Sequence, residues 1–216
     1  MVIATARLSR RRWLSRALVM FGMLPRISGG SAPPSGIVNI RGSARINGVA
    51  ATAGMAVRVG DELATAPGAD ITLVIGADAM LIRGNSQAHF VPVGRDGAYL
   101  LRLITGAVLA VFAPGAPRHV RTATAEIGIR GTAAYVSVEP DRTYVCICYG
   151  TARLAALGDM QAAETVTTTH HDEPRYIYRS GMPQMIGPAP VLNHTDEELE
   201  MLEGLVGRKP PFTGAY

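Results

Sequence analysis

The sequence predicts an all-β domain of many short strands, with one short C-terminal helix docked on it. From Gly36 to Ala156, short apolar or alternating runs are separated by turn residues, and no stretch keeps a 3.6-residue hydrophobic period. The chain contains 24 glycines and 14 prolines among 216 residues, which indicates many turns. Near the C-terminus, a single segment combines a helix cap with helical apolar spacing.

The first 30 residues predict an export signal. A basic stretch precedes a short apolar run from Ala17 to Leu24, and small residues follow. Within it, Ser9 to Leu14 resembles the twin-arginine export motif, with Arg10 and Arg11 as the paired arginines. We expect cleavage after Gly30 and a linker over residues 31–35. The alternatives are an uncleaved leader that anchors the protein to a membrane and a basic amphipathic surface helix.

The leader also explains the charge of the chain. The formal net charge is +4, but residues 1–30 contain six arginines and no acidic residue, so the remainder has a net charge of −2. Aromatic residues make up only 6% of the sequence. A body without net positive charge and with few aromatic side chains argues against nucleic-acid binding.

The first half of the predicted domain consists of short strands. Gly36 to Arg41 begins it, and the Asn47-Gly48 pair between alternating residues predicts a hairpin turn. Further apolar runs cover Ala69 to Ile75, Ala79 to Ile82 and Leu100 to Phe112. Glu126 to Ala156 then predicts two longer strands joined by a turn at Glu139-Pro140-Asp141-Arg142.

Four fragments in this region, in this order, resemble the FecR domain family. They are VRVGDELAT from Val57, ITLVIGADAMLI from Ile71, LITGAVLAVF from Leu103, and VRTATAEIGIRGT from Val120, with the two strands and closing Gly150 that follow. FecR domains are β-rich periplasmic modules, best known from regulators that relay a signal from an outer-membrane receptor to a sigma factor. The resemblance covers residues 36–156.

The resemblance implies a compact roll with solenoid-like layering, in which Gly60, Gly106, Gly131 and Gly150 form tight corners. It also implies a periplasmic location and a protein partner in the cell envelope. The chain departs from the full regulators, because the leader stands where they carry a cytoplasmic helical domain and little sequence is left for a second periplasmic lobe. We therefore expect an exported, stand-alone FecR-like protein and no anti-sigma regulator.

The C-terminal extension, residues 157–216, has a different composition. Residues 180–190 are rich in Gly, Pro and Met and predict an extended linker on the domain surface. Residues 195–206 predict the helix, with Thr195 as N-cap and Glu198 completing a capping box. Its apolar face would dock on the β domain through Leu199, Leu202, Leu205 and Val206.

The two cysteines, Cys146 and Cys148, lie on one predicted strand with Ile147 between them. Alternation places both thiols on the same face of the sheet, at a separation near the upper limit for a disulfide. One interpretation is that both are small buried hydrophobic residues. The other is that they ligate a soft or borderline transition metal.

Three histidines follow the cysteines and make a metal site possible. These are His170, His171 and His194, and Asp172 or Glu173 could serve as a further ligand or orient one of them. Neighbouring residues of an extended segment point in opposite directions, so we expect only one of His170 and His171 to join the cysteines. The spacing matches no standard zinc motif. His89 and His119 stand in strand-like contexts and are assigned no role.

No standard catalytic motif is present in the sequence. It has no nucleophile elbow, no phosphate-binding loop and no dinucleotide fingerprint. The first interpretation is therefore a non-enzymatic binding or signalling scaffold of the cell envelope. The second is a periplasmic transition-metal-binding protein that uses the Cys-x-Cys pair and the C-terminal histidines. An enzyme built on that metal centre is a third possibility.

Overall fold

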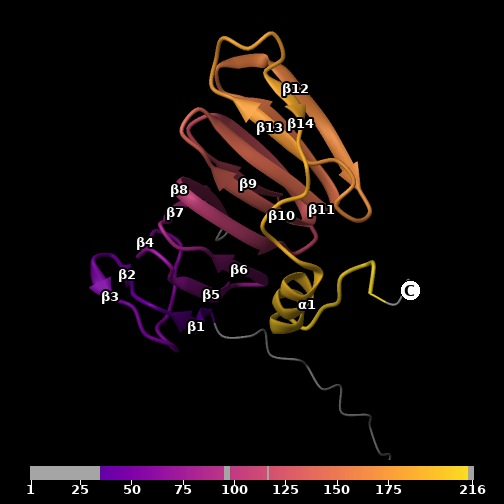
Figure 1. The fold of residues 1–216 in the computed structure, drawn as a ribbon. Helices are drawn as coiled ribbons and strands as arrows, with labels where there is room; N and C mark the ends of the chain where they lie inside the picture. Colours follow the sequence, from indigo (N-terminus) through magenta and orange to yellow (C-terminus); the bar gives the residue numbers. More distant parts are fainter. Residues whose placement is uncertain (1–34, 95–97, 116, 214–216) are drawn as a thin grey trace, which may run out of the picture. The chain divides into compact units, whose positions relative to one another are not determined.

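The computed structural model describes residues 35–94, 98–115 and 117–213 (Figure 1). The predicted export signal, residues 1–30, lies outside the described residues, as does the linker apart from Ser35. Within the described residues, no helix has the length and hydrophobicity needed to cross a membrane.

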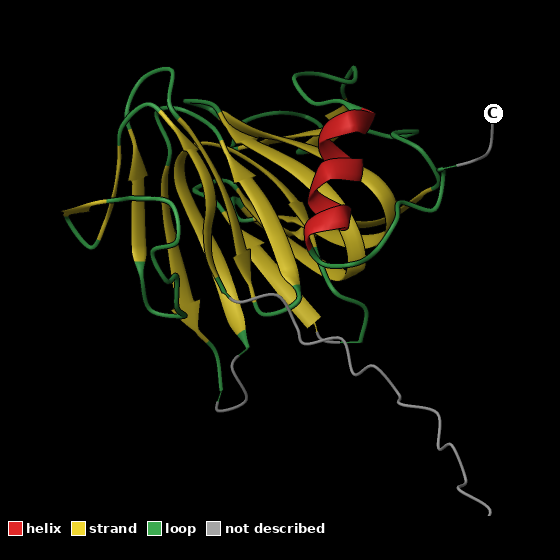
Figure 2. Ribbon diagram, turned by 90° about the horizontal axis from the view of Figure 1, so that it is seen from below, coloured by secondary structure: helices red, strands yellow, loops and turns green. Residues whose placement is uncertain are grey.

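The described residues form one predominantly antiparallel sheet, which confirms the all-β prediction (Figure 2). Its fourteen strands are β1 (Gly36–Arg41), β2 (Ala44–Ile46), β3 (Val49–Ala50), β4 (Glu62–Thr65), β5 (Asp70–Ile75), β6 (Asp78–Ile82), β7 (Gln87–Pro92), β8 (Tyr99–Val111), β9 (Pro117–Arg121), β10 (Ala125–Val138), β11 (Arg142–Ala156), β12 (Asp159–Thr168), β13 (Arg175–Tyr178) and β14 (Ile186–Pro188).

The order of the strands is β14-β13-β11-β10-β9-β8-β7-β4-β2-β3. A branch runs from β8 through β6 and β5 to β1, and β12 pairs with β11 beside β13. Strand β8 pairs with β9 in parallel and with β10 in antiparallel orientation. The long central strands therefore connect the early hairpins to the C-terminal ones.

Side-chain alternation along these strands separates two apolar cores, one on each face. The larger core takes Ile147 from β11, and the second core takes Cys146 and Cys148. We call the second one the helix-side core, because Leu199 and Leu202 of the C-terminal helix complete it. Its sheet residues include Val74, Leu81, Leu109, Val111 and Tyr135.

Turn residues behave as their chemistry predicts. Asn47 and Gly48 join β2 to β3 with φ values of 49° and 78°, the left-handed pair that a tight hairpin turn requires. The four predicted corner glycines all have positive φ. At Gly150, an added Cβ would lie 2.7 Å from the side chain of Thr132, so this corner has no room for a larger residue.

The sheet continues past the domain boundary expected at Ala156. Strands β12 and β13 both pair with β11, and β14 pairs with β13. Strand β14 lies within residues 180–190, which were expected to form an extended linker. At the end of β12 exposed and buried side chains alternate, with Thr165 and Thr167 exposed and Val166 and Thr168 buried, so a strand with one buried face has a polar sequence.

The C-terminal helix α1 (Asp196–Leu205) has the predicted cap and docking face. Thr195 accepts a hydrogen bond from the Glu198 amide, and the Glu198 side chain accepts one from the Thr195 amide, which completes the capping box. Leu199 and Leu202 are fully buried, and Leu205 packs at the margin of the helix-side core. The helix contacts β6 and β8, so it covers this face of the sheet (Figure 2).

Candidate metal centre

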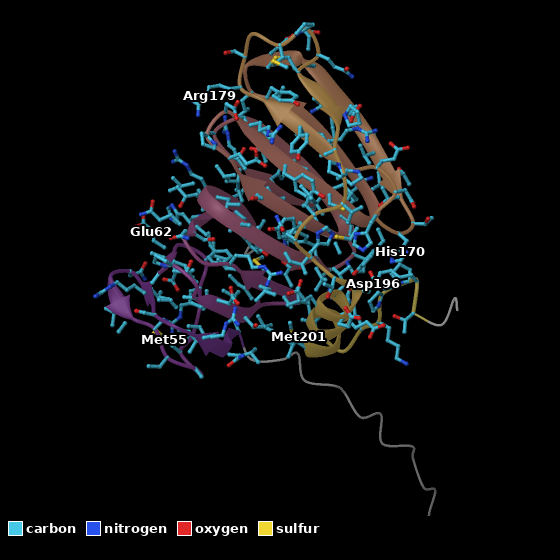
Figure 3. The ribbon with its side chains drawn as sticks, in the orientation of Figure 1. Met55, Glu62, His170, Arg179, Asp196 and Met201 are labelled. Atoms are coloured by element: carbon cyan, nitrogen blue, oxygen red, sulfur yellow. The ribbon has the colours of Figure 1, made fainter. Side chains whose placement is uncertain are left out.

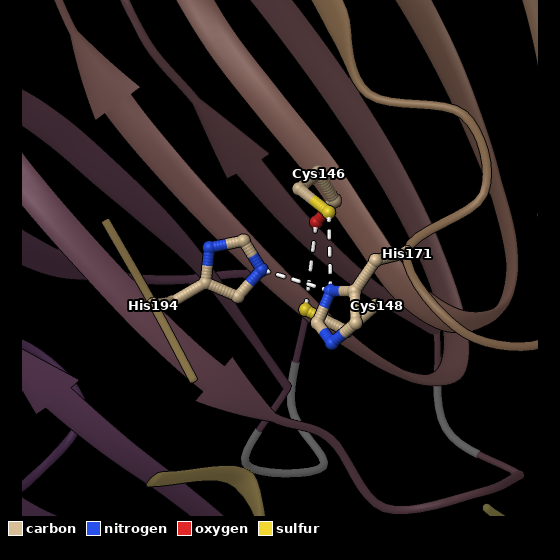
Figure 4. A group of neighbouring side chains, drawn as sticks. All are labelled: Cys146, Cys148, His171 and His194. Atoms are coloured by element: carbon tan, nitrogen blue, oxygen red, sulfur yellow. Dashed lines mark hydrogen bonds between the residues drawn. The ribbon is translucent and has the colours of Figure 1, made fainter. Parts of the chain in front are cut away.

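Cys146, Cys148, His171 and His194 converge on the helix-side face of β11 (Figure 4). One potential ligand atom from each of the four residues lies within 4.8 Å of the others. Both cysteines are fully buried and unbridged, and His194 is 9% exposed. The sequence predicted all four as candidates, and the fold brings them together from three separate segments.

The two cysteines come from the middle of a fully buried strand segment. Residues 143–149 of β11 are buried on both faces, and β10 pairs with them at Tyr135 opposite Cys146. The rigid ladder therefore fixes both thiols on one face, with Ile147 in the larger core.

The second segment is the turn between β12 and β13, which carries His171. The His171 amide donates to the Cys148 carbonyl at 2.9 Å, so the turn is anchored directly to the cysteine strand. His171 itself has a φ of 54°, a left-handed conformation that breaks the extended course of the chain. Asp172 accepts from the amides of Thr169 and His170 and from the Thr169 hydroxyl, which stabilises the turn.

This turn corrects one expectation about the two neighbouring histidines. Of the two, only His171 lies beside the cysteines, a choice that the sequence left open, and the two rings do not point in opposite directions. Their centroids lie 4.9 Å apart, and both rings bond Asp196. Figure 3 shows His170 near Asp196. The reason is the left-handed backbone at His171, since alternation holds only in an extended chain.

The third segment leads into α1 and carries His194. Its Nε2 lies 2.9 Å from His171 Nδ1, and its ring stacks on Tyr135 at a centroid distance of 4.9 Å. Asn193 precedes it in a left-handed conformation with a φ of 61°. This local turn directs the imidazole back onto the sheet before the helix begins at Asp196.

Groups around the cluster orient both imidazoles. His171 Nε2 donates to the Asp196 carboxylate at 3.0 Å, and His194 Nδ1 donates to the Leu192 carbonyl at 2.6 Å. These bonds place the remaining lone-pair nitrogens, His171 Nδ1 and His194 Nε2, toward the thiols. Metal-binding histidines are held in the same way, with the outer nitrogen bonded to a carboxylate or a carbonyl.

Asp196 is the orienting carboxylate that the sequence analysis missed. Asp172 and Glu173 were expected in that role, but Asp172 stabilises the turn and Glu173 pairs with Arg175. Burial alone would raise the pKa of Asp196, but hydrogen bonds from His170 and His171 outweigh it and lower that pKa. The sequence signal was its position, two residues after His194 in the first turn of a capped helix.

When both inner nitrogens are unprotonated their lone pairs repel, and either a proton or a metal ion between them would remove the repulsion. With their outer nitrogens protonated, neutral His171 and His194 direct two lone pairs at each other across 2.9 Å. A proton on one of the two nitrogens would form a hydrogen bond to the other, but it would involve only these two atoms of the cluster. A metal ion would accept both lone pairs together with those of the two sulfurs.

The pKa shifts of the thiols also favour a positive charge at this site. A hydrogen bond from Cys148 lowers the pKa of Cys146, with further contributions from His171 and His194. Burial raises the pKa of Cys148. Burial alone would lower the pKa of His171, but its bonds to Cys146 and Asp196 outweigh this and raise it. These shifts favour a thiolate at Cys146 and oppose one at Cys148, so two thiolates together would require a compensating positive charge.

One sulfur–nitrogen distance in the cluster matches that of a tetrahedral site, and the nitrogen–nitrogen distance is shorter. Metal–sulfur and metal–nitrogen bonds of about 2.3 and 2.05 Å, set at the tetrahedral angle, separate sulfur from nitrogen by about 3.6 Å and two nitrogens by about 3.4 Å. Cys146 Sγ lies 3.5 Å from His171 Nδ1. The two imidazole nitrogens would need to move apart slightly, because they lie 2.9 Å from each other.

A surface depression of about 470 Å³ opens over the histidine edge of this cluster. It is lined by His170, His171, Asp172, Val191, His194, Thr195 and Asp196. The cysteines lie beneath it and are fully buried. An ion could therefore reach the cluster from the histidine side, past Asp196.

Comparisons with known proteins identify the fold only. No protein-family model matches the sequence, and no curated protein matches it. Two crystal structures of a "putative anti-sigma factor" from Parabacteroides distasonis ATCC 8503, at 1.65 and 2.50 Å resolution, each superpose with a TM-score of 0.50. They share 12% and 13% sequence identity with this chain, cover 66% of it, and are themselves covered over 65% and 64%. The match thus spans less than two thirds of those proteins.

Proposed function

We propose that this chain is an exported, FecR-like envelope scaffold that binds a transition metal through Cys146, Cys148, His171 and His194. The observation that carries the metal site is the convergence of four nitrogen and sulfur donors within 4.8 Å, with both imidazoles oriented by outer hydrogen bonds. Buried thiols without a ligand role would account for the cysteines, but not for the two histidines that face them.

A signalling role for the scaffold is supported by two lines of reasoning that do not depend on the metal. The ordered FecR-like fragments of the sequence lie on strands and turns of a β fold. That fold superposes on the Parabacteroides structures, which are described as anti-sigma factors. A role in envelope signalling, through a protein partner, is the function that these likenesses favour for this chain.

The charge of the site favours a divalent ion of borderline softness, such as Zn²⁺. Two thiolates and a divalent cation form a core without net charge, whereas a monovalent ion would leave a buried negative charge beside Asp196. Burying an uncompensated charge is costly, so the neutral combination is preferred. Two cysteines and two histidines are also a common ligand set for structural zinc.

Four protein ligands favour a binding role over catalysis. Catalytic zinc sites keep one position for water or substrate, whereas structural sites fill all four with side chains. With both sulfurs and both nitrogens bound, no open position remains at this centre. The metal would then stabilise a conformation of the scaffold, and we propose no reaction for it.

Elemental analysis tests the metal site directly. The protein is purified without chelators beside Cys146→Ala/Cys148→Ala, with His89→Ala as a control histidine outside the cluster. We expect close to one metal ion per chain in the wild type and in His89→Ala, and almost none in the double variant. Equal metal content in all three proteins, or none in the wild type, would contradict the proposed site.

Cell fractionation tests the proposed export separately. The wild type is compared with Arg10→Lys/Arg11→Lys, which keeps the charge and removes the paired arginines. We expect the wild type in the periplasmic fraction and the variant in the cytoplasm. Equal distribution of the two proteins would exclude the twin-arginine route.

A further inference from the structure

The metal ligands come from segments that are distant in sequence. Cys146 and Cys148 lie in the middle of the sheet, whereas His194 belongs to the segment that carries α1. Asp196, which orients His171, is the first residue of that helix. A bound ion would therefore connect the C-terminal segment to β11 by a direct bond.

That segment also covers apolar surface. Leu199 and Leu202 are fully buried against the helix-side core, whose sheet residues include Leu109 and Val111. Removal of the segment would expose this face of the sheet to water. Such exposure is unfavourable, and it would also create a surface on which an apolar helix could bind.

The remaining attachments of the segment lie around the cluster. Arg83 donates to Glu198 at 2.7 Å and to the Asn193 carbonyl at 3.1 Å. The Leu192 amide donates to the Tyr144 hydroxyl at 3.0 Å. Arg208 donates to the Ala77 carbonyl at 2.8 Å, beyond the end of the helix. These contacts are polar and partly exposed, so each contributes modestly to docking. A further attachment is buried: the Tyr149 hydroxyl of β11 donates to the Glu203 carboxylate of the helix.

We propose that the metal ion controls the docking of residues 189–208, so that the metal-bound protein holds α1 closed over the helix-side core. This inference rests on the proposed metal site. When the segment detaches, the two cysteines and His171 stay together, but the site loses His194 and the orienting Asp196. Metal affinity and docking are therefore coupled, and each strengthens the other by the same factor.

Hydrogen exchange of the full chain tests this coupling, with zinc and with a chelator. The informative amides are those of residues 202–206, at the end of the helix remote from His194 and Asp196. We expect zinc to slow their exchange by about tenfold or more. Amides of β7, which pairs with β4 and β8 and contributes Ala88 and Phe90 to the larger core, serve as the reference and should change much less.

A pair of leucine variants tests the reverse direction. Leu202→Ala weakens docking without touching a ligand, and Leu101→Ala removes an equally buried leucine from the larger core. We expect Leu202→Ala to lower zinc affinity by about five- to tenfold and Leu101→Ala by less than about twofold. Excess zinc should restore slow exchange of α1 in Leu202→Ala.

The outcomes separate the two proposals. Zinc that binds at one equivalent but slows only amides beside the ligands, at residues 169–172 and 192–195, would overturn the coupling and leave the metal site standing. Equal zinc affinity of Leu202→Ala and Leu101→Ala would overturn it as well. A wild-type protein that binds no zinc would overturn both proposals.

Discussion

Neighbouring residues of the β10–β11 hairpin point to opposite faces of the sheet and enter different cores. Val145 and Ile147 enter the larger core, which consists of aliphatic and aromatic side chains from β1 to β14. Cys146 and Cys148, one residue away, enter the helix-side core beside two histidines. The larger core comes almost entirely from the strands, with Val57 added from the loop between β3 and β4. The helix-side core requires a turn, a connecting segment and a helix from elsewhere in the chain.

Under the proposed function, one face stabilises the fold and the other responds to a metal ion. Apolar burial in the larger core depends on area and packing, which no ion changes. The polar cluster on the opposite face gains favourable energy only when its donors are satisfied. The following predictions test that contrast, from the largest expected effect to the smallest.

Substitution in the larger core should have the greatest effect and be independent of metal. Phe90 is fully buried there, so Phe90→Ala should lower the free energy of unfolding by about 3–5 kcal/mol. Urea denaturation measures this loss with zinc and again with a chelator. A loss that depended strongly on zinc would show that the two faces are not separate.

Removal of the cysteines should abolish zinc-dependent stability. With zinc at roughly 100 times its dissociation constant, the wild type should gain about 2.7 kcal/mol, and Cys146→Ala/Cys148→Ala should gain almost nothing. Thermal denaturation with and without zinc gives the comparison. A variant stabilised by zinc as much as the wild type would place the binding site elsewhere.

Asp196→Asn should weaken metal binding without removing a ligand. The carboxylate orients His171, and loss of such a partner typically lowers metal affinity by about 10- to 100-fold. Competition with a chromogenic chelator measures this affinity. Asp172→Asn is the matched control, because Asp172 adjoins His171 in sequence but bonds the turn. A similar loss in both variants would argue for a general disturbance of the turn.

Loss of the helix cap should have the smallest effect. Thr195→Ala removes the hydroxyl that accepts from the Glu198 amide and should lower the free energy of unfolding by about 1 kcal/mol. Circular dichroism during urea denaturation detects a change of this size. Thr195→Ser retains the acceptor and should unfold like the wild type; a loss equal to that of Thr195→Ala would show that the hydroxyl is unimportant.

Local chemistry made much of the fold predictable. Asn47-Gly48 and the Thr195 capping box each act through their own backbone geometry, so they could be located from the sequence, whereas the four corner glycines were implied by the FecR resemblance. Alternation in β11 likewise predicted that both thiols share a face. Strand β14 could not be predicted in this way, because Ile186–Pro188 forms a strand only through its pairing with β13.

The site was predictable in its residues but not in its arrangement. Thiols and imidazoles are recognisable metal ligands at any spacing, which made the four residues candidates. Their contact depends on left-handed turns at His171 and Asn193, two residue types that adopt this conformation only in particular contexts. The carbonyl of Leu192, which orients His194, carries no sequence signal at all.

Titration with Co²⁺, a spectroscopic substitute for Zn²⁺, tests the central claim most directly. If both thiols and both imidazoles bind one ion, the wild type should show intense thiolate-to-cobalt charge-transfer bands and tetrahedral d–d bands that saturate at one equivalent. Cys146→Ala/Cys148→Ala should show neither, and zinc should displace the cobalt. A wild-type spectrum with only the weak bands of hydrated cobalt would contradict the metal centre.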